Sequence, residues 1–506
     1  MSEPVLLGID LGTTRTKVGL ITTTGVPIGF GRAAHASDVD PSSGRAEQDP
    51  EAWWAGLGAA VREAVVAGAR ATGNEVVPAG ICVAGHGPTL TAVDADGRAV
   101  RPAITWLDTR SIQERNELEA ATGLRGWALG VLPAARWLER NEPEAAARTR
   151  WYLNSWEALA LRLTGRAATS IVPGGASGPR DTLEATGLVL DRLAPEVSAG
   201  TPLGGLLPDA ARHLGIRAGT PVVAGLVDAF ASFHGARMLA PGDAIDVGGA
   251  AGGFGVYADH PIEVAGGFTT AAPLPGLNSV GGAMAATGAS LDWFASEILG
   301  GATPIADLVA EAAAVEAGAD GLLFLPYLAG ERSPLWDPTA RGVFAGLTLG
   351  HGRAHLVRAI IEAAALAIRH VAAPMLAAGI EVDAMRACGG PSRDDGWNQI
   401  KADVTGFTVE VPRVRETAAV GAAIVAAVGV EAQPDLPTAI RAMTSIDRRF
   451  EPDPARKRRY DHVYEAYVAL HPAVAPVLRR LEAGLGAARA ADDLPDHAAI
   501  RAGAAT

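Results

Sequence analysis

Two short segments, one near the start and one near the middle of the chain, share a pattern that constrains the fold. Ile9-Asp-Leu-Gly-Thr-Thr14 aligns with Ile245-Asp-Val-Gly-Gly-Ala250, with the aspartate and the first glycine at matching positions. Each segment belongs to an apolar run typical of a buried strand and continues into further strand-like sequence. A repeated unit indicates an internal duplication. We therefore predict an α/β protein of two related domains that meet near residues 240–244, with a cleft between them.

The length and composition agree with this division. A chain of 506 residues corresponds to two to four domains, and 48% apolar with 20% charged residues is a globular composition. We predict a first domain over residues 1–242 and a second over residues 243–475. Residues 476–506 are predicted to form a C-terminal helix and tail, because the sequence from about Leu481 is rich in alanine.

The opening pattern predicts a hairpin of two strands, over residues 5–10 and 17–22, joined by a glycine-containing turn. A nicotinamide-dependent oxidoreductase is disfavoured, because its dinucleotide fingerprint needs G-x-G-x-x-G leading into a helix. Further apolar runs predict strands over 79–84 and 221–225, and helical spacing predicts helices over 53–71, 110–121, 132–140 and 155–163. Asp49-Pro50-Glu51 is a start signal for the first of these helices.

The charge balance excludes two classes of partner. Lys+Arg is 43 and Asp+Glu is 56, a net charge of −13, and the only lysines are Lys17, Lys401 and Lys457. Nucleic-acid binding and electrostatic membrane anchoring both need clustered positive charge, so we predict neither. The uncharged stretch 264–291 contains prolines and many glycines, which disfavour a membrane-spanning helix.

The chain start and the cysteines indicate a cytoplasmic protein. The first residues lack the basic and long apolar regions of a signal peptide. Cys82 and Cys388 are too few for a disulfide framework, and we expect both to be buried free thiols in a reducing cytosol. The sequence leaves the oligomeric state open, a homodimer being one option.

The turn Asp10-Leu-Gly-Thr-Thr-Arg-Thr-Lys17 has the chemistry of a phosphate site. A tight turn between two strands presents backbone N–H groups to an anion, the threonines add hydroxyl donors, and Lys17 adds a point charge. Asp10 is placed to hold Mg²⁺ through water. The alternative is an ordinary hairpin turn with a capping aspartate, and the segment is neither a Walker A loop nor a dinucleotide fingerprint.

Three more segments combine glycines or carboxylates with strand ends. Gly248-Gly-Ala-Ala-Gly-Gly253 allows close approach of backbone to a ligand, or forms a glycine-rich bulge. Asp228 follows an apolar strand and precedes a helix, which suits either a general base or a helix cap. In Cys388-Gly-Gly-Pro-Ser-Arg393 the paired glycines can lie flat against a base or ribose, or simply connect a strand to a helix.

Another segment, Trp106-Leu-Asp-Thr-Arg110, places alternating polar side chains after an apolar strand, which fits a ligand contact or a surface ion pair. Two longer patterns are more specific. Gly342-Val-Phe-Ala-Gly-Leu347 is followed after seven residues by His355-Leu-Val-Arg-Ala-Ile-Ile-Glu362, and Phe324-Leu-Pro-Tyr-Leu-Ala-Gly-Glu-Arg-Ser-Pro334 precedes both. Over roughly residues 6–470 the ordered set of segments resembles the FGGY carbohydrate kinase family.

The resemblance implies two ribonuclease-H-like domains of the actin type, with the sugar bound from the first domain and ATP from the second. It implies that Asp10 assists Mg²⁺ and that Asp228 is the catalytic base, in contact with the sugar. The residues implied to face ATP are Gly12, Thr13, Thr14 and Lys17 in the first turn, Gly249 and Ala250 in the second, and Gly389 and Gly390 at the adenosine. Those implied to contact the sugar are His86, Gly87, Pro88, Trp106 and Asp108.

Two departures from the family pattern bear on the substrate. Gly87-Pro88 stands where glycerol kinases carry an Arg-Glu pair, so glycerol is disfavoured. Xylulokinases typically have a Met-His-Gly segment nearby, which Gly85-His86-Gly87-Pro88 matches imperfectly, and a ketopentose such as xylulose remains the favoured substrate class. Ribulose, erythritol and gluconate are the alternatives. Ala250 stands where the family often has threonine, and loss of one hydroxyl donor costs ~1 kcal/mol. That loss also leaves open a non-catalytic sugar or nucleotide sensor on the same fold.

Overall fold

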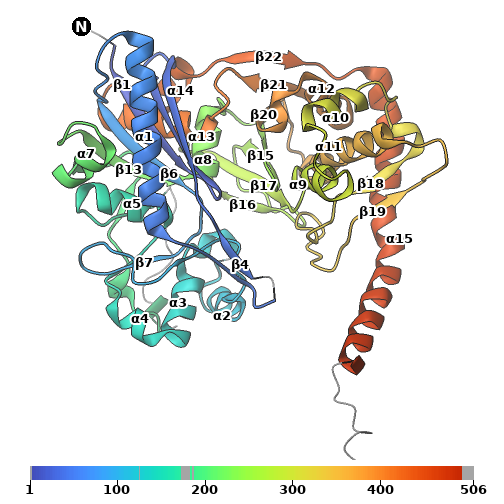
Figure 1. Cartoon of the computed structure of the whole chain (residues 1–506), viewed down its shortest axis with the longest axis horizontal. Coiled ribbons are helices and arrows are strands. Elements are labelled where there is room, and N and C mark those ends of the chain that lie inside the picture. The colour runs from blue at the N-terminus through green and yellow to red at the C-terminus, as the bar shows by residue number, and fades with distance from the viewer. Residues whose placement is uncertain (1–2, 41, 125, 172–182, 185–186, 493–506) are drawn as a thin grey trace, which may run out of the picture.

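The computed structural model describes residues 3–40, 42–124, 126–171, 183–184 and 187–492. This part of the chain forms two large sheets, the first built from strands that precede residue 228 and the second from strands that follow residue 242. In Figure 1 the blue and green strands of the first sheet lie beside the green and orange strands of the second, with helices packed around both.

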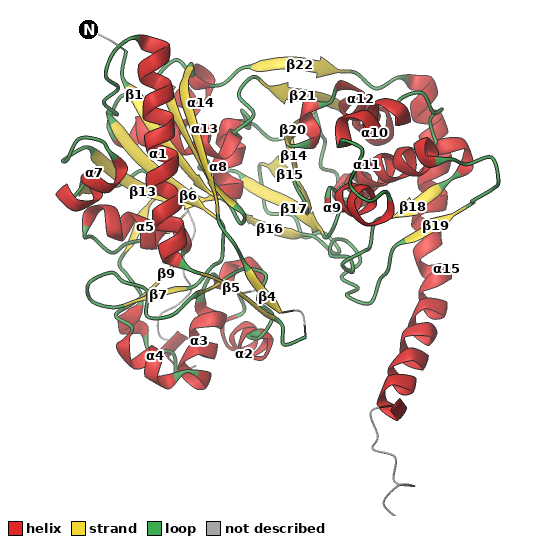
Figure 2. Cartoon of the chain, viewed as in Figure 1, coloured by secondary structure: helices red, strands yellow, loops and turns green. Residues whose placement is uncertain are grey.

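The first sheet has the strand order β12-β13-β6-β1-β2-β3. These strands span Pro202–Gly205, Pro221–Val227, Gly80–Gly85, Val5–Leu11, Arg15–Thr22 and Pro27–Ala34. The second sheet has the order β16-β17-β15-β14-β20-β21-β22. Its strands span Phe268–Ala271, Asn278–Met284, Gly252–Ala258, Asp243–Gly248, Ala384–Gly389, Thr408–Pro412 and Ile446–Phe450. Figure 2 shows both sheets in yellow between red helices.

The two sheets repeat one connectivity. β1 pairs antiparallel with β2 and parallel with β6, while β14 pairs antiparallel with β15 and parallel with β20. Asp10 and Asp246 therefore lie on corresponding strands, each followed by a hairpin. The predictions of an internal duplication and of an opening hairpin are confirmed.

The described residues also contain short strands that pair in four small sheets. β4 (Asp38–Asp40), β5 (Arg45–Gln48) and β8 (Ala103–Ile104) form one small sheet. The remaining pairs are β7 with β9 (Thr91–Val93 and Trp151–Leu153), β10 with β11 (Thr169–Ile171 and Glu196–Ser198) and β18 with β19 (Leu323–Leu325 and Val343–Ala345).

Helices surround the sheets. Before residue 242 they are α1 (Pro50–Thr72), α2 (Ile112–Thr122), α3 (Leu132–Asn141), α4 (Pro143–Arg148), α5 (Ser155–Thr164), α7 (Pro208–Leu214) and α8 (Asp228–Gly235). After it come α9 (Ala289–Trp293), α10 (Ile305–Ala312), α11 (Arg353–Ala377), α12 (Asp395–Thr405), α13 (Thr417–Gly429), α14 (Leu436–Met443) and α15 (Pro454–Asp492). The predicted helices are confirmed to within a few residues, and Asp49 caps α1 by accepting a hydrogen bond from the Glu51 N–H.

Helices α8 and α13 lie between the two sheets, where one buried cluster includes Leu6 from β1 and Ile245 from β14 (Figure 1). The two helices touch backbone to backbone. A Cβ added to Gly421 of α13 would lie 1.8 Å from the carbonyl oxygen of Ala231 in α8, so only glycine fits there. The helices that follow β13 and β21 thus join the two halves directly.

α11 is the only described helix that is long and apolar enough to cross a membrane by composition. However, 72% of its most apolar window is buried inside the protein, in contact with the cores of the second half. This is the burial expected of a core helix.

The C-terminal helix begins earlier than the sequence predicted. α15 starts at Pro454 instead of near Leu481, because Asp453 accepts hydrogen bonds from the N–H groups of Ala455 and Arg456 and so starts the helix. Prolines within α15 break the sequence pattern but not the helix. Residues 493–506 of the predicted tail lie outside the described residues.

Candidate active site

Three parallel strands of the first sheet end side by side, and the chemically distinctive residues follow these ends. Leu11 of β1 and Val227 of β13 both lie opposite Gly85 of β6. The His86 N–H donates to the Leu11 carbonyl oxygen at 2.9 Å. Asp228, one residue beyond β13, is also the first residue of α8. The sheet therefore brings the first turn, His86 and Asp228 to one edge.

Asp10 and Lys17 face each other across the β1–β2 hairpin and meet a third charge from the second half. The Lys17 Nζ lies 3.5 Å from Asp10 Oδ2 and 3.2 Å from Glu416 Oε2. Glu416 is the residue before α13. Burial alone would lower the pKa of Lys17, but attraction to Asp10 and Glu416 raises it, so Lys17 is held as a cation.

The two aspartates at this edge differ from ordinary carboxyls. Burial raises the pKa of Asp10, although the adjacent Lys17 opposes the shift. Burial raises the pKa of Asp228 to about 7, and the nearby Asp10 charge adds to the increase. The Asp228 side chain stays partly accessible at the floor of a cleft, and its Oδ1 accepts a hydrogen bond from the Ala229 N–H. A carboxylate that titrates near neutral pH is suited to general-base chemistry.

The cleft above these residues has a volume of about 1020 Å³ and lies between the two halves. Its lining brings together six residues that the sequence analysis singled out, namely Asp10, Gly12, Lys17, Asp228, Gly389 and Gly390. The other predicted site residues lie outside this lining, and they are Thr13, Thr14, His86, Gly87, Pro88, Trp106, Asp108, Gly249 and Ala250. The cleft thus contains the predicted metal and base carboxylates and part of the predicted nucleotide site.

The second glycine turn and the Gly389-Gly390 turn are in direct contact. Gly248 at the end of β14 pairs with Gly389 at the end of β20. Gly389 has φ +78°, and a Cβ there would lie 1.7 Å from the Gly248 carbonyl oxygen, so the position requires glycine. The turn that contains Gly249 and Ala250 is held by backbone, since the Ala250 carbonyl oxygen accepts from the Ala289 N–H at 2.9 Å.

The first turn is tied to the neighbouring segments through Thr13. The Trp106 indole N–H donates to Thr13 Oγ1 at 3.1 Å, and the Gln48 amide donates to the Thr13 carbonyl oxygen at 2.6 Å. Thr14 is exposed, and its carbonyl oxygen accepts from the His35 N–H. Trp106 therefore contacts the predicted phosphate turn directly.

His86 is buried and neutral. Burial, with a smaller contribution from His35, lowers the pKa of His86 to about 3. Its Nδ1 lies 2.9 Å from the Thr89 hydroxyl, while its Nε2 has no hydrogen-bond partner among the described residues. Gly87 and Pro88 continue the loop after β6 beside it. An unpaired buried ring nitrogen is a feature of this loop that a polar ligand could satisfy.

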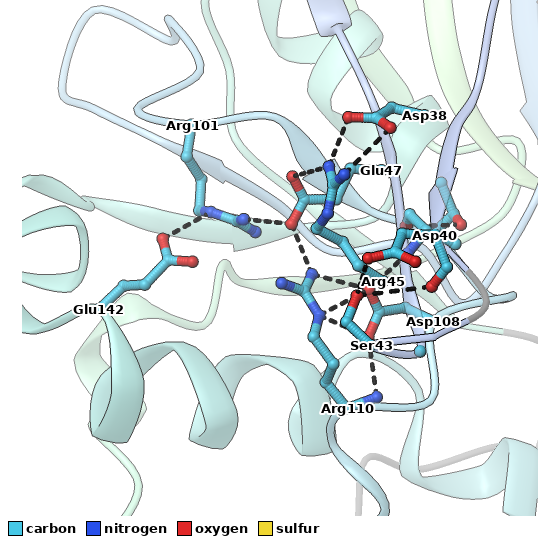
Figure 3. Close-up of polar contacts among 12 residues, drawn as sticks. Asp38, Asp40, Ser43, Arg45, Glu47, Arg101, Asp108, Arg110 and Glu142 are labelled. Atoms are coloured by element: carbon cyan, nitrogen blue, oxygen red, sulfur yellow. Dashed lines mark hydrogen bonds and ion pairs between the residues drawn. The ribbon is translucent and has the colours of Figure 1, made fainter. Parts of the chain in front are cut away.

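Asp108 lies in a network of charges around β5, which Figure 3 shows in close-up. Its carboxylate accepts hydrogen bonds from the Ala46 N–H at 2.8 Å and from the Arg110 backbone and guanidinium. Glu47 beside it forms ion pairs with Arg45, Arg101 and Arg110. The side chain of Asp108 is 1% exposed, so it holds Arg110 and β5 in place in this structure.

Several cleft residues carried no signal in the sequence. Besides Lys17, the cations that line the cleft are Arg15, Arg32, Arg393, Arg413 and Arg415. Glu416, which pairs with Lys17, was also missed. Arg15 and Arg393 lie within segments that the sequence analysis singled out but were given no role there. Arg32 lies on β3, and Arg413, Arg415 and Glu416 lie in the segment before α13, so their place at the cleft follows only from the fold.

The described residues fit a magnesium–nucleotide complex better than a dedicated metal cage. No group of three or more His, Cys, Asp or Glu side chains among them could hold a metal ion. Mg²⁺ that is bound with a nucleotide needs only one or two protein carboxylates, because water and phosphate oxygens supply the other ligands. Asp10, which lines the cleft, is the carboxylate that the sequence analysis predicted for this role.

Known proteins match this chain over nearly its whole length. Residues 5–235 match the model of the N-terminal domain of the FGGY family of carbohydrate kinases, and residues 247–430 match that of its C-terminal domain. Xylulose kinase of Escherichia coli K12 is 30% identical and aligns over 93% of this chain and 99% of its own. Gluconokinase of Bacillus subtilis 168 is 29% identical over 83% of this chain and 86% of its own.

A solved structure agrees with the sequence matches. Xylulose kinase from Rhodospirillum rubrum has a TM-score of 0.78 and 31% identity, and it covers 94% of this chain and 100% of its own. The duplicated actin-type fold, the cleft and both family models lead to one assignment: this chain belongs to the FGGY family of carbohydrate kinases.

Proposed function

We propose that the protein transfers the γ-phosphoryl group of ATP to a hydroxyl of a ketopentose such as xylulose. The observation that carries the proposal is Asp228, a carboxylate with a pKa of about 7 at the floor of a cleft that also contains Lys17 and Gly389. The relatives that are named xylulose kinases support the substrate class.

The reaction needs a base, a positioned phosphoryl group and stabilisation of negative charge. In the proposed mechanism Asp228 accepts the proton of the sugar hydroxyl as its oxygen attacks the γ-phosphorus in line. Lys17, held as a cation by Asp10 and Glu416, and the backbone N–H groups of the first turn stabilise the charge on the transferred group. A magnesium ion held by Asp10 would neutralise phosphate charge when ATP is bound.

We assign the sugar to the first half of the chain, residues 1–242, and the nucleotide to the second half, residues 243–475. Under this assignment Gly389 and Gly390 face the adenosine, while Thr13, Thr14, Gly249 and Ala250 face the phosphates. His86, Gly87, Pro88 and Trp106 form the sugar side, and Asp108, whose buried carboxylate engages Arg110 and the Ala46 N–H, supports it. Because substrate and ATP bind from opposite halves, approach of the halves would expel water and limit ATP hydrolysis.

A cytoplasmic location is part of the proposal. Cys82 and Cys388 are both free and buried, as predicted, which suits a reducing compartment that also supplies ATP.

Replacing Gly390 with alanine tests the nucleotide side. A Cβ at Gly390 would meet no atom within 4 Å, so the fold is retained, but the methyl group would enter the space of the cleft. We expect the KM for ATP to rise about tenfold while the thermal unfolding midpoint is unchanged. Gly352→Ala is the matched control, because that glycine also has open space around it and lies outside the cleft lining. Equal KM values for the two variants would remove Gly390 from the nucleotide site.

The pH dependence of the reaction tests the base. Only the deprotonated form of Asp228 accepts a proton, and burial raises its pKa to about 7. At saturating ATP, kcat/KM for the sugar should therefore rise about tenfold from pH 6 to pH 8 and then level off. A profile that is flat over this range, or that falls, would contradict the role of Asp228 as a base that titrates near neutrality.

A substrate panel tests the function itself. ADP release would be measured with xylulose, ribulose, erythritol, gluconate and glycerol, and the product would be identified as a 1-phosphate or a 5-phosphate by NMR. We expect the highest kcat/KM with xylulose and the lowest with glycerol, because Gly87-Pro88 replaces the polar pair that holds glycerol hydroxyls. If no member is phosphorylated by folded protein that binds ATP, the proposal fails for this panel.

A further inference from the structure

Arg332 is a cation from the second half of the chain that reaches a predicted sugar-side residue in the first half. It belongs to the segment between β18 and β19. Its guanidinium carbon lies 5.4 Å from the centre of the Trp106 ring, within the range of a cation–π contact. The indole N–H of Trp106 donates a hydrogen bond to Thr13 Oγ1. Trp106 therefore contacts both Arg332 and the first turn.

The charge of Arg332 is balanced only in part, by attraction to the neighbouring Glu331 carboxylate. Among the described residues, no hydrogen bond or ion pair involves its guanidinium. The neighbouring Glu331 directs its Oε1 to the N–H groups of Ala285 and Arg332, at 2.8 and 2.7 Å. Arg332 is half-buried, and desolvation lowers its pKa. In this half-buried position the five N–H donors of Arg332 are open to water, and a ligand with oxygen atoms could replace that water.

The position of Arg332 is fixed by its neighbours. The Glu331 N–H donates to the Asp337 carbonyl oxygen, and the Ser333 N–H donates to the Ala283 carbonyl oxygen, both at 2.9 Å. Ala283 belongs to β17 of the second sheet. The backbone on either side of Arg332 is therefore held, and the guanidinium is presented to Trp106 from a rigid segment.

We propose that Arg332 donates hydrogen bonds to oxygen atoms of the acceptor sugar at the Trp106 face and is a specificity-determining residue of the second half. This inference rests on the proposed function. A guanidinium is a planar fork that suits two adjacent oxygens, such as the carbonyl and a neighbouring hydroxyl of a ketose.

The nucleotide phosphates are the less suitable ligand for Arg332. Arg332 does not line the cleft that contains Asp10, Lys17 and the Gly389-Gly390 turn, and that cleft already has six cations of its own. An oxygen-rich acceptor at Trp106 is the ligand that this position favours. Sugar binding would then join the two halves, because Trp106 of the first half and Arg332 of the second half would contact the same molecule.

The test compares Arg332→Met and Arg332→Lys with the unaltered protein, using D-xylulose as the first probe and D-gluconate as the second. We expect Arg332→Met to raise the KM and the calorimetric dissociation constant for D-xylulose about 10- to 100-fold, with a smaller increase for Arg332→Lys. The KM for ATP should change less than about twofold. Because the contact is to a Trp, quenching of tryptophan fluorescence by the sugar should be reduced in parallel.

Arg341→Met is the control within the same segment. Arg341 is 44% exposed and pairs with Glu482, so the variant should leave the sugar constants unchanged. If the sugar constants of Arg332→Met equal those of an active unaltered protein, the inference is wrong. If the constants for the sugar and for ATP rise together, the role of Arg332 is only to keep the two halves of the chain in contact, and the inference is also wrong. If the unaltered protein neither binds nor phosphorylates either probe, the proposed function fails instead.

Discussion

Replacing Asp228 with asparagine is expected to lower kcat by about 100- to 10,000-fold, the range contributed by a positioned general base. The amide keeps the size of the carboxyl and can still accept the hydrogen bond from the Ala229 N–H, but it cannot take a proton. In the proposed mechanism Asp228 acts at the sugar hydroxyl and not at the adenosine, so the dissociation constant for ATP should stay within about twofold of the original value. Steady-state kinetics and calorimetry measure the two quantities separately.

Asp209→Asn is the matched control for this variant. Asp209 is also in the first turn of a helix of the first half, but its side chain is 88% exposed, and Arg212 is its one ion-pair partner among the described residues. We expect its kcat to be unchanged. The structure already excludes Asp228 as the helix cap, because Val227 is the N-cap of α8. An Asp228→Asn protein that retains kcat within about threefold would leave Asp228 only its contact with the Ala229 N–H at the start of α8.

Replacing Lys401 with methionine is expected to reduce the free energy of unfolding by about 3–5 kcal/mol, the cost of leaving a buried charge without its partner. Lys401 on α12 forms an ion pair with Asp246 on β14, and both side chains are at most 3% exposed. No other hydrogen-bond donor to the Asp246 carboxylate is present among the described residues, so loss of Lys401 leaves Asp246 unpaired in the core of the second half. Urea unfolding followed by circular dichroism gives the difference.

A second substitution, of Asp246, distinguishes the effect of the unpaired charge from the effect of lost packing. If the stranded charge is the cause, adding Asp246→Ala to Lys401→Met should restore most of the lost stability. Lys457→Met is the control, because Lys457 is 40% exposed and pairs with Asp461 on the surface of α15, which predicts a loss below ~1 kcal/mol. Equal losses for the two lysine variants would contradict the assignment of a costly buried pair.

The duplicated sheets could be predicted because the repeat is local in sequence. Six residues around Asp10 and six around Asp246 were enough to indicate two hairpins on corresponding strands. The start of α15 could not be predicted, because Pro472 and Pro476 inside the helix look like ends and only the capping contacts of Asp453 show the true start.

Some residues of the candidate site could likewise be predicted from the sequence, and others could not. Asp10, Lys17, Asp228 and the Gly389-Gly390 turn each carry a local pattern, and the structure places them around one cleft. Glu416 carries none, since its partner Lys17 is about 400 positions away and the pair exists only when the halves meet. The sequence around Asp108 suggested either a ligand contact or an ion pair. In the folded protein its carboxylate forms an ion pair with Arg110 and accepts a hydrogen bond from the Ala46 N–H of β5.

The net charge of −13 suggested that anion binding must depend on local donors. The glycine turns supply such donors, but the structure adds a second source. Arg15, Arg32, Arg413 and Arg415 line the cleft, and no ion pair links any of them to a described carboxylate. The lining of the cleft thus has more cations than carboxylates, although the whole protein is acidic, and such an excess would favour capture of an anion at low salt.

The glycine contact between α8 and α13 has a consequence for engineering. Asp228 begins α8 and Glu416 precedes α13, and the two helices touch through Gly421 and Ala231 without intervening side chains. A chimaera that takes one half from another protein would have to bring a compatible small residue to this crossing. Recombination boundaries in this chain should therefore be chosen so that α8 and α13 come from the same parent protein.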